Sequence, residues 1–196
     1  MNIFLDFEAT NYGNHLISIG AIAEDGRSFY SVVNPGPKNR RKITPFITEL
    51  TGITKEMCKE APTYEEIFES FFDWCFALGD PDLHFFCYGD CDELYIKDAN
   101  DKVTDNIKAE FITRYMLQNI TDYSDNVKKH LELVCRAKLI KVASFYEQKE
   151  LTQQHNALED AKLLKFVYEK AENGLESDSI EFKEFLEQNK EQKEGR

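Results

Sequence analysis

The stretch that decides the fold is Phe4–Thr10, FLDFEAT, at the beginning of the chain. Apolar and acidic residues alternate here, and side chains two positions apart in a strand share a face. The pattern predicts a β-strand over residues 2–8, with Asp6 and Glu8 as neighbours on one face. Two carboxylates in this position repel each other and raise each other's pKa unless a cation lies between them. The strand therefore predicts either metal ligands or a solvated edge.

The segments that follow extend this strand into a sheet. Residues 15–23 and 28–33 are predicted strands, and Asp25-Gly26 supplies a tight hairpin turn between them. A short buried strand is predicted over 83–88, ending at Gly89. Helices are predicted over residues 62–78, 92–99, 107–117, 127–137 and 156–172, with a helical turn over 44–50 after a basic loop, 38–42. Strands followed by mixed strands and helices predict an α/β fold, with an antiparallel meander plus parallel strands in one mixed sheet flanked by helices.

Composition limits the classes of protein that fit. The 196 residues carry 24 basic and 36 acidic side chains, a net charge of −12, which argues against gripping long nucleic acid by charge alone. No apolar run is long enough for a membrane span, and the N-terminus does not resemble a secretory signal. Five cysteines, none in a C-x-x-C pair, favour reduced thiols in a cytoplasmic protein. The length predicts one domain. The composition changes from Asn173-Gly174 onward, so we expect this domain to cover residues 1–173 and an acidic helical extension to cover 174–196.

A second group of acids follows the buried strand at 83–88. The sequence Cys87-Tyr88-Gly89-Asp90-Cys91-Asp92 places two carboxylates at the carboxyl end of that strand, where ligand sites gather in α/β sheets. The alternative is that Asp90 or Asp92 only caps the next helix.

The third group begins the helix at 156–172, in His155–Ala161, HNALEDA. Asp160 lies on the apolar stripe of this helix, in line with Leu164 and Val167, so it faces the protein interior. A buried carboxylate needs a partner, which is a metal ion or an ordinary ion pair or cap. His155 lies about one turn away.

Taken together, the three groups predict a metal site. Four carboxylates that converge offer the oxygen ligands that Mg²⁺ or Mn²⁺ prefers. Two such ions stabilise the attacking and leaving oxygens in phosphodiester cleavage. His155 is the candidate general base, since an unperturbed imidazole titrates near 6.5.

The segments FLDFEAT, CYGDCD and HNALEDA resemble, in order and spacing, the three motifs of the DEDDh exonucleases, the DnaQ-like relatives of the bacterial proofreading subunit. The resemblance covers about residues 1–172. It implies a ribonuclease-H-like fold and a metal-dependent enzyme that removes nucleoside 5′-monophosphates in the 3′→5′ direction. It also implies the roles of the site residues. The metal ligands are Asp6, Glu8, Asp92 and Asp160, and the base is His155. The family's spacing selects Asp92 over Asp90, which is then a neighbour or a helix cap.

The resemblance also suggests where a substrate lies, because ITPFITELTGIT (43–54) resembles a substrate-side loop of this family. The residues expected to contact the 3′ end of single-stranded RNA or DNA are Phe7, Ala9, Thr10, Leu50, Thr51, Gly52 and Ile53. Core packing is the alternative for Leu50 and Ile53. The basic residues in 38–42 and 128–141 either meet phosphates or form solvated faces.

The motif pattern is closest to the RNA-trimming, sporulation-inhibitor-like members, which favours RNA over DNA modestly. Two alternatives remain: a DNA proofreading or repair exonuclease in a polymerase assembly, with the acidic tail as the docking element, and a binding module that does not cleave. The oligomeric state is open.

Overall fold

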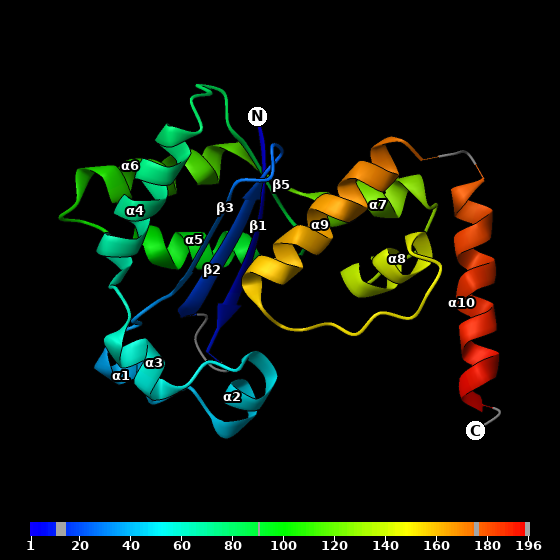
Figure 1. Ribbon diagram of the computed structural model, residues 1–196, viewed down its shortest axis with the longest axis horizontal. Coiled ribbons are helices and arrows are strands. Elements are labelled where there is room, and N and C mark those ends of the chain that lie inside the picture. Colours follow the sequence, from blue (N-terminus) through cyan, green and yellow to red (C-terminus); the bar gives the residue numbers. More distant parts are fainter. Residues whose placement is uncertain (11–14, 90, 175–176, 195–196) are drawn as a thin grey trace.

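The computed structural model describes residues 1–10, 15–89, 91–174 and 177–194, with side chains through residue 188 (Figure 1). One five-stranded sheet lies at its centre, in the order β3-β2-β1-β4-β5. The strands are β1 (Asn2–Ala9), β2 (Leu16–Ala23), β3 (Ser28–Val32), β4 (His84–Cys87) and β5 (Ile120–Asp122). The first three form the predicted antiparallel meander, whereas β4 runs parallel to β1 and β5 parallel to β4. The mixed sheet expected from the sequence is therefore confirmed.

Helices cover both faces of the sheet (Figure 1). They are α1 (Pro37–Arg40), α2 (Pro45–Thr51), α3 (Lys55–Glu60), α4 (Tyr64–Ala77), α5 (Cys91–Asn100), α6 (Ile107–Asn119), α7 (Tyr123–His130), α8 (Leu139–Tyr146), α9 (Ala157–Glu172) and α10 (Asp178–Glu194). The alternation along β1 separates two cores. Leu5 and Phe7 pack with α4, α5 and α6, and Phe4 packs on the opposite side with α7, α8 and α9. Asp6 and Glu8 share the Phe4 face, so they point toward α9.

Two predicted elements differ from the structure. The helix expected over 127–137 is wrong, because α7 begins earlier, capped by the Asp122 side chain, and ends at His130. The segment 131–138 is irregular instead. It is held to the carboxyl ends of β4 and β5 by a hydrogen bond from Tyr88 Oη to the Ala137 carbonyl (2.9 Å) and by an ion pair between Arg136 and Asp122 (3.1 Å). The basic loop at 38–42 is also different, since α1 occupies most of it. The short elements α3, β5 and α8 were not predicted.

The C-terminal segment is helical, as predicted, and its first half packs on the domain. Phe182 of α10 is fully buried and meets the Phe145 ring of α8 edge to face. The buried Asp178 carboxylate, at the start of α10, lies 3.1 Å from His130 Nε2 and accepts a hydrogen bond from Tyr146 Oη. Every helix within the described ranges is too short or too polar to span a lipid bilayer.

Candidate functional site

The site begins with a close approach between α9 and the sheet. Gly20 of β2 is the register partner of Asp6 on β1, so both positions face α9. A Cβ atom at Gly20 would lie 2.2 Å from the Ala157 carbonyl carbon and 2.2 Å from the Leu158 amide nitrogen. Only a glycine therefore lets the first turn of α9 lie directly on the strand that neighbours Asp6.

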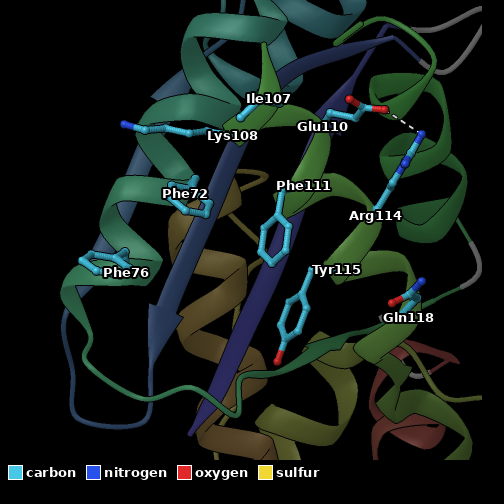
Figure 2. A pocket seen from close by; sticks show the side chains of 9 residues that line it. All are labelled: Phe72, Phe76, Ile107, Lys108, Glu110, Phe111, Arg114, Tyr115 and Gln118. Atoms are coloured by element: carbon cyan, nitrogen blue, oxygen red, sulfur yellow. Dashed lines mark ion pairs between the residues drawn. The ribbon is translucent and has the colours of Figure 1, made fainter.

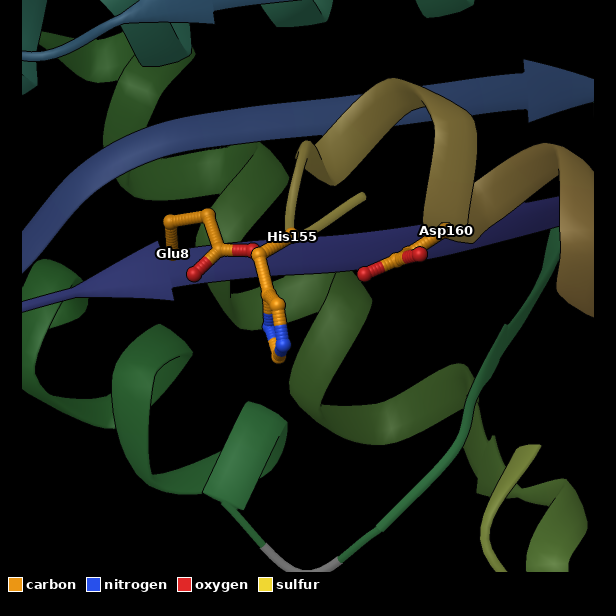
Figure 3. Close-up of side chains that lie close together, drawn as sticks. All are labelled: Glu8, His155 and Asp160. Carbon is orange, nitrogen blue, oxygen red and sulfur yellow. The ribbon is translucent and has the colours of Figure 1, made fainter. Parts of the chain in front are cut away.

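The first turn of α9 then delivers two of the predicted residues. The Asn156 side chain accepts hydrogen bonds from the Leu158 and Glu159 amides, which fixes where the helix begins. Asp160, one turn in, is only 3% exposed, as its place on the apolar stripe predicted. His155 precedes the cap with φ +49°, a left-handed conformation that is uncommon for a residue with a side chain. One ligand atom from each of Glu8, His155 and Asp160 lies within 4.8 Å of the other two (Figure 3).

Asp92 approaches from the other side of β1. It lies in the first turn of α5, immediately beyond β4, and is 6% exposed. Burial raises the pKa of Asp6 well above its usual range, and the charges of Asp92, Asp160 and Glu8 raise it further. Charge effects of this kind act between carboxylates that lie near one another. The structure thus brings together four acids that lie on one strand and two helices.

The electrostatics of this cluster favour a bound cation. Burial, with the charges of Asp160 and Asp92, raises the pKa of Glu8 to about 8. Burial raises the pKa of Asp92 to about 7 and also raises that of Asp160. No lysine or arginine forms an ion pair with any of the four in the part of the chain that the structure covers. Buried and half-buried carboxylates that pair with no protein cation offer oxygen ligands beside one imidazole, and such ligands fit hard divalent ions.

Gln153 is a site residue that the sequence analysis missed. Its Nε2 donates to Asp160 Oδ2 at 3.0 Å, so this amide orients the carboxylate. Gln153 and Gln154 both precede His155, and nothing in the sequence tells which of them points inward.

The predicted substrate contacts separate into two groups. Phe7 and Thr10 are buried, and Ala9 is half-buried beside them. In the 43–54 segment, Gly52 is exposed and Leu50 and Thr51 are half-buried. Ile53 is different, because it is 2% exposed in a core cluster with Ile47. The expectation that Ile53 wedges against a base is therefore wrong for this structure, and core packing holds. Asp90 lies outside the described residues.

Two cavities differ in their relation to the acids. One, of about 400 Å³, has Asp6 in its wall together with Gln153, Arg136 and Lys138. A larger one, of about 850 Å³, lies between α4 and α6 and is lined by aromatic side chains such as Phe72 and Phe111 (Figure 2). None of the predicted site residues lines the larger cavity.

Comparison with known proteins agrees with this geometry. Residues 3–168 match the family described as Exonuclease (RNase_T). The PolC-type DNA polymerase III of Caldanaerobacter subterraneus subsp. tengcongensis is 29% identical over 172 residues. That match covers 82% of this chain and only 11% of the polymerase, so the chain spans about a ninth of this relative.

Two solved structures share the ribonuclease-H-like fold. The nuclease domain of 3′hExo, a DEDDh family member bound to rAMP, aligns with a TM-score of 0.71 at 18% identity, covering 89% of this chain and 93% of that one. A 3′-exonuclease from a study of histone mRNA stem-loop recognition aligns with a TM-score of 0.67 at 16% identity, covering 89% and 64%. The family match over most of the chain, together with four converging carboxylates and a histidine, leads to one conclusion: the chain belongs to the exonuclease family.

Proposed function

We propose that this protein removes nucleoside 5′-monophosphates from the 3′ end of single-stranded nucleic acid, with RNA modestly preferred to DNA. The observation that carries the proposal is the convergence of Asp6, Glu8, Asp92 and Asp160 beside His155, without a protein cation among them in the described ranges. The same convergence argues against a binding module that does not cleave, because holding an RNA end does not require four mutually repelling carboxylates.

The four carboxylates are the proposed ligands of two divalent cations, Mg²⁺ or Mn²⁺. Bound ions of this kind lower the pKa of a water molecule and stabilise charge on the attacking and leaving oxygens. His155 would accept the proton of the attacking water at a ring nitrogen, since its imidazole lies within 4.8 Å of the carboxylates of Glu8 and Asp160. Gln153 would keep Asp160 in its orientation through their hydrogen bond.

The terminal nucleotide is proposed to lie between the carboxyl end of β1 and α2, because Ile47 of α2 packs with Ile17 at the start of β2, the strand that pairs with β1. Phe46 of α2 is 59% exposed, and an aromatic face stacks on any base. Half-buried Leu50, with Thr51 and exposed Gly52, would complete this side, and the backbone of Phe7, Ala9 and Thr10 would approach the terminal sugar. Such contacts predict little base specificity.

The preference for RNA rests on the resemblance to RNA-trimming members, and two of the structural neighbours were solved in studies of rAMP binding and of an mRNA stem-loop. The PolC-type relative is a DNA polymerase, which favours the alternative of proofreading or repair within a polymerase assembly. In that alternative, the acidic residues of 174–196 would bind a protein partner. A cytoplasmic location stays a prediction.

A single set of reactions tests the proposal. Single-stranded RNA and DNA of equal sequence, labelled at the 5′ end, are incubated with Mn²⁺ and either the native protein or Asp160→Asn. A ladder that shortens from the 3′ end, with mononucleotide release, is expected for the native protein and absent for the variant. Equal circular dichroism spectra would show that the variant is folded. The RNA:DNA rate ratio tests the substrate preference. Retained binding without any cleavage by the native protein would refute the enzyme and favour the binding module.

A further inference from the structure

The cavity beside Asp6 contains two cations that the proposed chemistry does not use. Its volume is about 400 Å³, and its wall runs from Asp6 and Gln153 at the acidic cluster to Arg136 and Lys138 in the 131–138 connector. The acidic cluster and the connector thus line opposite ends of one cavity. A nucleic-acid strand whose 3′ end is bound at the acidic cluster would have this cavity next to it.

Arg136 is held in place by two acidic residues, Asp122 and Asp125, that are not part of the acidic cluster. Its Nη1 lies 3.1 Å from Asp122 Oδ2, and its Nε and Nη2 donate to the two Asp125 oxygens at 2.9 and 2.8 Å. Asp122 also accepts from the Gly89 amide at 2.9 Å, which ties this network to the end of β4. These contacts fix the connector, and with it the position of Lys138, relative to the acidic cluster.

Lys138 differs from Arg136 because its charge is uncompensated. Within the ranges that the structure describes, no carboxylate lies within ion-pair distance of its Nζ. Its side chain is exposed at the position before α8 and makes no capping hydrogen bond there. Lys141, one turn further along, lies 3.8 Å from Glu150 and does not line the cavity. An unpaired ammonium group at the wall of a cavity attracts an anion.

We propose that Lys138 binds a backbone phosphate of the retained strand, on the 5′ side of the scissile bond. This inference rests on the proposed function. The terminal nucleotide is assigned to the α2 side of β1, and the cavity opens from Asp6 toward the α7–α8 connector. The 131–138 connector therefore faces the part of the substrate that stays bound after the terminal nucleotide leaves. Contact through phosphate is independent of base identity, so Lys138 contributes affinity for single strands without sequence preference.

The test compares two substrates that differ only in whether a retained strand is present. One is a single-stranded oligonucleotide, and the other is the p-nitrophenyl ester of thymidine 5′-monophosphate, whose leaving group carries no phosphate. For Lys138→Ala, we expect KM for the oligonucleotide to rise about tenfold, the size of one charged hydrogen bond. We expect kcat/KM for the ester to stay unchanged. Lys138→Arg, which keeps the charge, restores most of the affinity, and Lys141→Ala is the matched control with no effect.

Salt dependence supplies a second readout that a structural role would not move. Each phosphate contact to a single strand contributes about 0.7 to the slope of log K against log salt concentration, so Lys138→Ala should lower the slope by about that amount. If the native protein cleaves both substrates and Lys138→Ala matches it in KM and slope, the phosphate assignment is refuted and the proposed function stands. If Lys138→Ala slows both substrates equally, the residue acts on the site's structure and the assignment also fails. If the native protein cleaves neither substrate, the proposed function itself is refuted.

Discussion

Glu8→Gln should stabilise the metal-free protein at alkaline pH while it removes the activity. The unfolded chain titrates this carboxyl near 4.5, and in the folded, metal-free protein its pKa is about 8, because of burial and the nearby charges of Asp160 and Asp92. Between these values the folded state binds more protons than the unfolded state. The free energy of unfolding therefore falls as pH rises through this window, and the contribution is fully present only below about pH 4.5.

The magnitude follows from the size of this interval. At about 1.4 kcal/mol per pKa unit, the change from 4.5 to about 8 corresponds to an upper bound of about 5 kcal/mol. Glu8 is partly exposed and water screens its charge, so we expect a gain of about 1–2 kcal/mol from the neutral amide. For a chain of this length, that gain raises Tm by about 2–8 °C.

The assay is thermal unfolding in EDTA at pH 4.5 and pH 8.5. We expect the Tm of Glu8→Gln to be higher than that of the native protein at pH 8.5 and equal to it at pH 4.5. Added Mn²⁺ should reverse the order at pH 8.5, because the native carboxylate cluster gains more from the cation. Glu93→Gln is the control, since Glu93 pairs with Lys97 on the exposed side of α5. A Glu8→Gln variant that melts below the native protein at pH 8.5 in EDTA would refute the reasoning.

Three further substitutions test the rest of the site and its support. Gly20→Ala should destabilise the protein by about 1–3 kcal/mol and abolish activity, because the new methyl group displaces the start of α9; unchanged denaturant melting would contradict this. Phe182→Ala should lower the free energy of unfolding by about 3–5 kcal/mol in the same denaturant experiment, and a decrease below about 1 kcal/mol would show that α10 is dispensable for folding. His155→Ala should slow cleavage by roughly 10²–10⁴-fold. Its metal affinity, measured by calorimetry, should change much less, and an equal loss of both would make His155 a ligand rather than a base.

The sequence predicted those parts of the site that depend on the regular repeat of side-chain directions in a strand or a helix. Asp6 and Glu8 share a face because the strand period is two, and Asp160 is buried because it falls on the apolar stripe of α9. The position just after a buried strand indicated both Asp90 and Asp92, and only the family resemblance selected Asp92. The family resemblance then supplied the roles of these residues, which periodicity cannot supply.

The parts that were missed depend on tertiary contacts. Val127, Leu131 and Val134 recur at helical spacing and favoured one helix over 127–137, yet Val134 is 98% exposed. The chain leaves the helix at Leu131 because Tyr88 and Arg136 hold the following connector against the sheet. Neither contact is visible in the sequence of that segment. The cavity lined by Lys138 exists only because of this connector, so the proposed phosphate site could not be predicted from sequence.

The turn at Gly52 determines that the Ile53 side chain lies in the core rather than in a substrate groove. Gly52 ends α2 with φ +73°, and its amide donates to the Thr48 carbonyl, which closes the helix with a left-handed residue. The chain then reverses and returns Ile53 to the same cluster as Ile47. Ile53 therefore helps to hold α2 in position, whereas Phe46 on the same helix stays exposed.

Three features at the start of α9 are each unfavourable for stability, and they coincide within one small region. Gly20 gives up a side chain in mid-strand, His155 adopts a left-handed backbone, and Asp6 lies half-buried among like charges. A protein that only binds RNA ends would gain stability by replacing any of them and would lose nothing. In an enzyme that holds divalent cations, the bound cations offset the repulsion among the carboxylates around Asp6. The enzyme needs Gly20 and the left-handed backbone of His155 to bring His155 and Asp160 to the strand. The metal-free protein should therefore be least stable at the pH at which these carboxylates are ionised, which is also the pH at which they bind the cations that activity needs. A protein of this fold that only binds RNA has no reason to show this relation.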